Sequence, residues 1–176
     1  TTVDRTSPVQ VGSATTWKAV AAGPAYNVAI RTNGTLWAWG ANDTGQLGDG
    51  TTTTRTSPVQ VGSAATWASL APGGFSTLAV RTDGTLWAWG DNATGQLGDG
   101  TTTDRLAPAQ VGSASTWKQA SASLYHVAAV RTDGTLWTWG ENGLGQLGDG
   151  TTISRSVPAQ VGSATNWDRV EVGSGF

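Results

Sequence analysis

The stretch TLWAWGANDTGQLGDGTT (residues 35–52) sets the architecture, because it returns along the chain at a fixed interval. Its segment GQLGDGTT begins at Gly45, Gly95 and Gly145, a period of 50 residues. Residues 1–50 and 51–100 are identical at 34 of 50 positions, which excludes chance similarity. A fixed period of this length indicates a repeat architecture. We interpret residues 1–176 as a single repeat domain, with full copies over 1–50, 51–100 and 101–150 and half a copy over 151–176.

Each copy has the pattern of four short β-strands. In residues 28–40, two apolar runs flank Asn33-Gly34, and Asn-Gly is a strong signal for a tight hairpin. We expect another strand over Trp17–Ala22, before the hairpin, and an edge strand over Val9–Val11, after Pro8, because proline lacks a backbone N–H. Four strands per copy, with no helical periodicity, predict an all-β propeller of four-stranded blades. A solenoid is the rival architecture, but its repeats are usually shorter.

Tryptophan explains how such a glycine-rich chain could hold together. The chain has ten tryptophans, and nine of them occupy three equivalent positions in the full copies. A buried aromatic side chain removes about 150–250 Å² from water, so tryptophan contributes heavily to a core. We therefore expect the indole rings to pack as wedges between neighbouring blades.

These residues resemble the regulator-of-chromosome-condensation repeat family. The resemblance rests on W-x-x-V-x-x-G, an apolar hairpin with DGTLWAWG, and NxxGQLGDGT, and it covers almost the whole chain. It implies a seven-bladed propeller, of which about 3.5 repeats are present. The ring would then be partial and belong to a longer array, or it would be completed by self-association.

Composition and charge exclude several classes of function. Charged residues make up 12% of the chain and the formal net charge is −2, so the basic surface that nucleic acids need is missing. Two lysines and no run of 18 apolar residues argue against membrane binding or spanning. There is no cysteine, and His126 is the single histidine, which leaves little for catalysis or for a metal site. We expect neither enzymatic activity nor a cofactor.

The repeated polar residues are interpreted as structural. One position carries arginine in each copy (Arg5, Arg55, Arg105, Arg155), and so does another (Arg31, Arg81, Arg131). A group that occurs once per blade is more consistent with a capped turn or a contact to the next blade than with catalysis. Calcium binding by Asn42, Asp43 and Asp49 is a weaker alternative, since no known calcium loop matches.

The candidate binding residues lie where the copies differ. All phenylalanines and tyrosines fall in the turn after the first strand: Tyr26, Phe75, Tyr125 and Phe176. If the blades are equivalent, these four residues form an arc on one face, with His126 beside Tyr125. Rigid aromatics on loops of a stiff scaffold are suited to binding hot spots. The alternative is that each aromatic only packs inside its own turn.

We therefore expect a non-enzymatic module whose face docks another macromolecule, with a protein favoured although a glycan is not distinguished. The resemblance implies other roles too, because family members include a nucleotide-exchange factor, a plant ultraviolet-B photoreceptor and secreted bacterial inhibitors of β-lactamases. A structural repeat segment without a dedicated site is the main alternative. The low-lysine, cysteine-free composition favours an extracellular or cell-surface location in bacteria.

Overall fold

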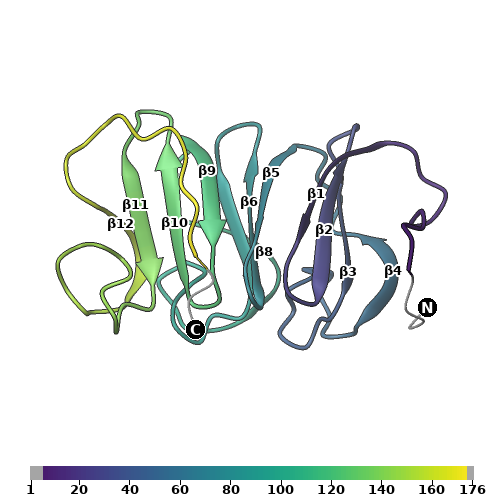
Figure 1. Ribbon diagram of the computed structural model, residues 1–176, viewed down its shortest axis with the longest axis horizontal. Coiled ribbons are helices and arrows are strands. Elements are labelled where there is room, and N and C mark those ends of the chain that lie inside the picture. Colours follow the sequence, from purple (N-terminus) through teal and green to yellow (C-terminus); the bar gives the residue numbers. More distant parts are fainter. Residues whose placement is uncertain (1–5, 174–176) are drawn as a thin grey trace.

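The computed structural model describes residues 6–173, and its regular structure is entirely β. The described residues form three four-stranded antiparallel sheets, each with its strands in sequence order, so each sheet is one blade. Figure 1 shows them standing side by side. The strands are β1 (Trp17–Ala22), β2 (Tyr26–Arg31), β3 (Leu36–Gly40), β4 (Arg55–Gln60); β5 (Trp67–Pro72), β6 (Ser76–Arg81), β7 (Leu86–Gly90), β8 (Arg105–Gln110); β9 (Trp117–Ala122), β10 (His126–Arg131), β11 (Leu136–Gly140), β12 (Arg155–Gln160).

The predicted propeller blade is confirmed, together with its central hairpin. β2 pairs with β3 from Ile30↔Leu36 to Tyr26↔Gly40. Gly34 in the connecting turn has φ 79°, a left-handed conformation that glycine adopts without steric cost. The first strands β1, β5 and β9 contact one another in succession, while β4, β8 and β12 form the opposite edge of each sheet. Each of these edge strands contains a proline, as expected for a strand with one unpaired side.

The predicted strand over Val9–Val11 is wrong. Its counterparts are β4, β8 and β12, and each of them pairs with the hairpin that precedes it in the chain. A structural blade therefore runs from Trp17 to Gln60 and begins 16 residues after the sequence copy does. Val9–Val11 has no preceding hairpin among the described residues, so it has no strand to pair with.

Tryptophans do pack between blades, as expected. Trp89 of the second blade is fully buried, and its Nε1 donates to the carbonyl of Gln46 in the first blade at 3.0 Å. Gly48 faces the same indole so closely that a Cβ would lie 2.6 Å from Nε1. Trp139 repeats this contact with Gln96 at 2.9 Å. The GQLG segment is thus a loop shaped to receive the next blade's indole.

The arginines at the end of each second strand have a different role from the one expected. The guanidinium carbon of Arg31 lies 3.7 Å from the ring centroid of Trp37 and 4.8 Å from that of Trp17. Arg81 and Arg131 repeat the arrangement in their own blades. These cations therefore stack on indoles of their own blade, where cation–π attraction is favourable, and do not bridge to the neighbouring blade.

Candidate binding face

Two sets of connections meet at one end of every blade, and we call this end the loop face. The first set is the turns after β1, β5 and β9, at residues 23–25, 73–75 and 123–125. The second is the long loops after β3, β7 and β11, at residues 41–54, 91–104 and 141–154. Because neighbouring strands are antiparallel, both sets lie on the same side, at the lower edge of Figure 1. The short hairpin turns lie on the opposite side, which we call the hairpin face.

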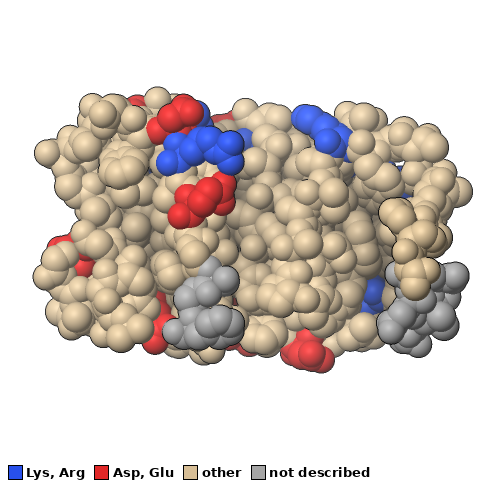
Figure 2. Space-filling view, in the orientation of Figure 1, with Lys and Arg blue, Asp and Glu red and all other residues tan. Residues whose placement is uncertain are grey.

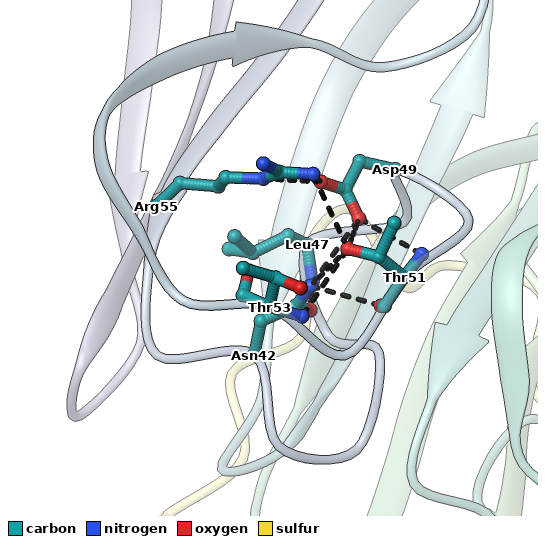
Figure 3. A network of polar contacts seen from close by, with 6 residues as sticks. All are labelled: Asn42, Leu47, Asp49, Thr51, Thr53 and Arg55. Carbon is teal, nitrogen blue, oxygen red and sulfur yellow. Dashed lines mark hydrogen bonds and ion pairs between the residues drawn. The ribbon is translucent and has the colours of Figure 1, made fainter.

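The long loops are held by a buried asparagine. Asn42 Nδ2 donates to the carbonyls of Thr51 and Thr53 at 2.9 and 3.2 Å, and its Oδ1 accepts from the backbone N–H of Leu47 at 3.0 Å. Figure 3 shows that this amide sits at the centre of the loop. Asn92 and Asn142 make the corresponding bonds in the other blades. A 14-residue connection is thereby made rigid.

An aspartate completes each loop. Asp49 accepts from Arg55 Nε at 2.7 Å and from Thr51 Oγ1 at 2.7 Å, as Figure 3 shows. Partial burial raises the pKa of Asp49, but the hydrogen bonds from Thr51 and Arg55 outweigh it, so the pKa lies below its ordinary value. Its carboxylate is thus occupied by loop contacts, as a structural role requires. Within residues 6–173, no three histidine or acidic side chains group as a metal site.

Tyr26 does not belong to an exposed arc. Its side chain is 1% exposed, and its hydroxyl donates to the carbonyl of Ser76 in the second blade at 2.6 Å. Burial raises the pKa of the phenol well above its ordinary value. The physical reason is a one-residue offset: Tyr26 corresponds to Ser76 and His126, whereas Ala25 corresponds to Phe75 and Tyr125. Since side chains alternate along a strand, Tyr26 points into the blade interface.

Phe75 and Tyr125 do lie on the loop face with exposed rings. Their side chains are 44% and 38% exposed. The backbone carbonyl of Phe75 accepts from Thr44 Oγ1 at 3.0 Å, and that of Tyr125 accepts from Thr94 Oγ1 at 3.0 Å. Each aromatic residue is therefore anchored by its backbone at a junction between two blades while its ring remains available. Phe176, the fourth predicted member, lies outside the described residues.

Leu144 is a residue that the sequence analysis missed. It occupies the position of Thr44 and Thr94, and its side chain is 86% exposed. In the first two blades this position contacts the turn of the following blade, since Thr44 and Thr94 donate to the carbonyls of Phe75 and Tyr125. Leu144 therefore marks a blade junction whose other side lies outside the described residues. The signal was available, because this is the one copy with an apolar residue at the third position of the N-x-x-G-Q-L-G pattern.

His126 and Ser123 form a capped turn. Ser123 Oγ lies 2.7 Å from His126 Nδ1 and accepts backbone N–H groups of Tyr125 and His126 at 3.3 and 3.1 Å. The serine is buried, and burial lowers the pKa of the imidazole despite the nearby carboxylate of Glu141. This geometry orders the turn that carries Tyr125, so His126 supports the loop face and is only partly exposed on it.

A hollow of about 550 Å³ lies where the three turns converge. Its walls include Pro24, Gly74 and Leu124, one from each turn, together with Val172. In the side view of Figure 2, charged atoms are sparse, and those near the lower edge, where the loop face lies, are mainly acidic. The loop face thus combines a hollow, exposed apolar side chains and a rigid support. Residues 6–173 contain no helix that is long and apolar enough to cross a bilayer.

Sequence comparison identifies the repeat. The profile of the Regulator of chromosome condensation (RCC1) repeat matches residues 33–80, 83–130 and 133–176. A second profile of the same repeat matches residues 17–46, 67–96 and 117–146. Among curated proteins, no sequence matches significantly.

Solved structures share the architecture. Human WBSCR16 superposes with a TM-score of 0.74 at 26% identity, over 82% of this chain and 37% of its own. Prp20p from Saccharomyces cerevisiae, described with its binding to Gsp1p and histones, gives 0.76 at 21% identity, over 84% of this chain and 38% of its own. Yeast RCC1 (Prp20) bound to Kap60 gives 0.76 at 21% identity, over 84% and 37%. This chain therefore spans little more than a third of each of them.

Proposed function

Because the chain belongs to the regulator of chromosome condensation (RCC1) repeat family, we propose that it is a non-enzymatic binding module whose loop face docks a protein partner. The observation that supports this most is the placement of Phe75 and Tyr125 at two successive blade junctions on that face, where both residues are exposed. Interface hot spots are enriched in aromatic anchors, and a preorganised scaffold lowers the entropic cost of binding.

The class of partner is a protein. Solved structures of the fold include Prp20 in complex with Kap60, which supports a protein partner for the architecture. The identity of the partner does not follow from that similarity. Catalysis is not part of the proposal, because the serine and histidine on this face are bonded to each other and to the backbone of their own turn.

Partner capture tests the proposal. We expect the double variant Phe75→Ala/Tyr125→Ala to lose at least one protein that the immobilised wild-type chain retains from the extract or culture medium of its source. The matched control is Lys18→Ala, an exposed side chain at the start of β1, on the hairpin side. If the double variant and the control retain the same proteins as the wild type, the loop-face proposal is wrong.

A purely structural role is the second candidate, and the near-identity of the copies favours it. Residues 1–50 and 51–100 share 34 of 50 positions, as expected when repeat number matters more than a tailored site. In that case the chain would be a segment of a larger extracellular or cell-surface protein. Identical capture profiles for the wild type and the loop-face variant would favour this role.

A further inference from the structure

The exposed aromatics have acidic partners directly opposite them. The β6–β7 pairing ends at Ser76↔Gly90, and one step further the N–H of Asp91 donates to the carbonyl of Phe75 at 3.0 Å. In the third blade, the N–H of Glu141 donates to the carbonyl of Tyr125 at 2.9 Å. Side chains directly opposite in an antiparallel pair have Cβ atoms about 5 Å apart. In these two blades, strand pairing thus places an acidic residue opposite an exposed aromatic residue.

The first blade lacks this chemistry at the same place. Its opposed pair is Ala25 and Ala41, joined by the same backbone hydrogen bond at 2.9 Å. The backbone geometry therefore does not require an aromatic and an acid here. Two of the three blades carry the combination, with Phe and Asp in one and Tyr and Glu in the other, so the side-chain chemistry is shared while the residues differ.

Neither carboxylate is neutralised by a cation among the described residues. The loop-face ion pairs within residues 6–173 use Asp49, Asp99 and Asp149. Asp91 is held in place by neutral donors, with Gln96 Nε2 at 2.7 Å from Oδ2. Both carboxylates are therefore partly exposed and have no cationic partner among the described residues.

The loop face as a whole is negative. Its loops and the strand ends they lead into carry seven carboxylates and three guanidiniums, a formal charge of −4: Asp43, Asp49, Asp91, Asp99, Asp104, Glu141 and Asp149, against Arg55, Arg105 and Arg155. The other charged residues within 6–173 sum to +2: Lys18, Arg31, Arg81, Lys118, Arg131 and Arg169, against Asp83, Asp133, Asp168 and Glu171. A partner approaching the loop face meets an attractive potential if it is basic.

We propose that Phe75–Asp91 and Tyr125–Glu141 are two neighbouring subsites for the basic side chains of a protein segment. In each subsite the carboxylate pairs with an ammonium or guanidinium group, and the ring packs against its methylene stem or its cationic face. The inference rests on the proposed function and deepens it by stating the chemistry of the partner.

The blade spacing sets the spacing of the ligand's charges. Facing sheets pack about 10 Å apart, and an extended chain advances about 3.3 Å per residue. Two basic side chains that point the same way from an extended segment lie two or four positions apart, about 7 or 13 Å. The two subsites therefore fit a segment with basic residues at positions i and i+2 or i+4.

Capped synthetic peptides in a glycine-serine background provide the probe, with two arginines at i,i+2 or i,i+4. In NMR titrations of the 176-residue chain, we expect these peptides to shift the amide signals of Phe75, Asp91, Tyr125 and Glu141. Matched peptides with neutral citrulline in place of arginine should bind about tenfold more weakly, since the charge-assisted bonds are lost. Equal binding of the two sets, or no shifts at millimolar concentration, would overturn the inference.

Variants separate charge from aromatic contact. The change Asp91→Asn/Glu141→Gln should weaken arginine-peptide binding about tenfold, comparable to the citrulline effect. The matched control Asp43→Asn removes a carboxylate from the same face in the blade without an aromatic, and should weaken binding less than twofold, as a distant screened charge. Conversely, Ala25→Phe/Ala41→Asp should create a third subsite and tighten the binding of a three-arginine peptide.

Different outcomes overturn the proposal of docking on the loop face and the inference of a basic segment. If Phe75→Ala/Tyr125→Ala abolishes capture of a protein partner while Asp91→Asn/Glu141→Gln leaves it unchanged, docking on the loop face stands and the basic-segment inference is overturned. If neither variant changes capture, both are overturned. The amide spectrum of each variant shows whether the fold is intact.

Discussion

Aromatic side chains have opposite roles in two regions of this molecule, the blade interface and the loop face. At the interface, Trp89 and Tyr26 are buried and each donates a hydrogen bond to a backbone carbonyl of the neighbouring blade. On the loop face, Phe75 occupies the position next to that of Tyr26 in the repeat, yet its ring is nearly half exposed. Alternation along the strand separates the two roles. Substitutions of interface aromatics should therefore change stability, and substitutions of loop-face aromatics should change docking, independently of each other.

We expect the largest difference in unfolding free energy between alanine variants of two tryptophans that have the same local sequence, Trp89 and Trp39. Trp89→Ala should lower the free energy of unfolding by about 3–5 kcal/mol, because it leaves a cavity between blades. Trp39→Ala should cost less than half as much, since Trp39 lines an open hollow of about 470 Å³ and is already partly exposed. Urea unfolding of both variants measures the difference. Equal losses would mean that the interface contributes little.

The second glycine of the GQLG loop gives another comparison, between a position packed against the next blade's indole and one with no close neighbour. Gly48 and Gly148 both have positive φ, 77° and 68°, so alanine is strained at either site. At Gly48, however, the Cβ would also lie 2.6 Å from Trp89 Nε1, whereas at Gly148 the nearest atom, on Val161, is 4.0 Å away. Gly48→Ala should therefore cost about 1–3 kcal/mol more than Gly148→Ala. Thermal unfolding at matched concentration tests this, and equal costs would contradict the packing argument.

Removing one hydroxyl tests whether Tyr26 is an interface residue. Tyr26→Phe leaves the ring in place but removes one of the two donors to the Ser76 carbonyl, the hydroxyl at 2.6 Å, while the N–H of Gly73 still donates to it at 2.7 Å. We expect a loss of about 0.5–1.5 kcal/mol in unfolding free energy, the net contribution of a typical intramolecular hydrogen bond. A variant as stable as the wild type would show that this hydroxyl contributes nothing to the interface.

Acid should destabilise the long loops of the loop face, with a smaller effect on the free energy of unfolding than the substitutions above. The pKa of Asp99 is lowered in the folded state, because hydrogen bonds from Thr101 and Arg105 outweigh the effect of burial. Its stabilisation is therefore present above the unfolded-state pKa of about 3.9 and is lost as the pH falls through the lower folded value. Since Arg105 is 40% exposed, solvent screening limits the contribution to less than about 1 kcal/mol. Asp99→Asn should be less stable than the wild type at pH 7, and the difference should vanish in acid.

The fold could be predicted from the sequence because its determinants are local or periodic. The 50-residue period, Asn33-Gly34 and the recurring tryptophans each point to blades packed through indoles, and the structure confirms them. The boundary of a blade could not be predicted in this way. A repeat has no intrinsic starting point, so only the pairing of β4 with β3 reveals that the edge strand belongs to the preceding hairpin.

The candidate site was predictable only in part. Copy-to-copy variation identifies Phe75 and Tyr125 from the sequence. It also groups Tyr26 with them, because all three lie near the same turn although Tyr26 is one repeat position further along. The acids Asp91 and Glu141 were missed because they lie 16 residues further along the chain than their aromatic neighbours and meet them only through strand pairing. For the arginines of the second strands, the sequence suggests a capped turn or a contact to the next blade, because it does not show that they stack on indoles.

The most direct test of the division between interface and loop face is the unfolding free energy of Phe75→Ala/Tyr125→Ala, measured beside Trp89→Ala in urea. If the loop-face rings are held for docking, the double variant loses less stability than the single tryptophan variant, whose expected loss is about 3–5 kcal/mol. A double variant that loses as much as Trp89→Ala would show that these rings are part of the packing and would contradict the account.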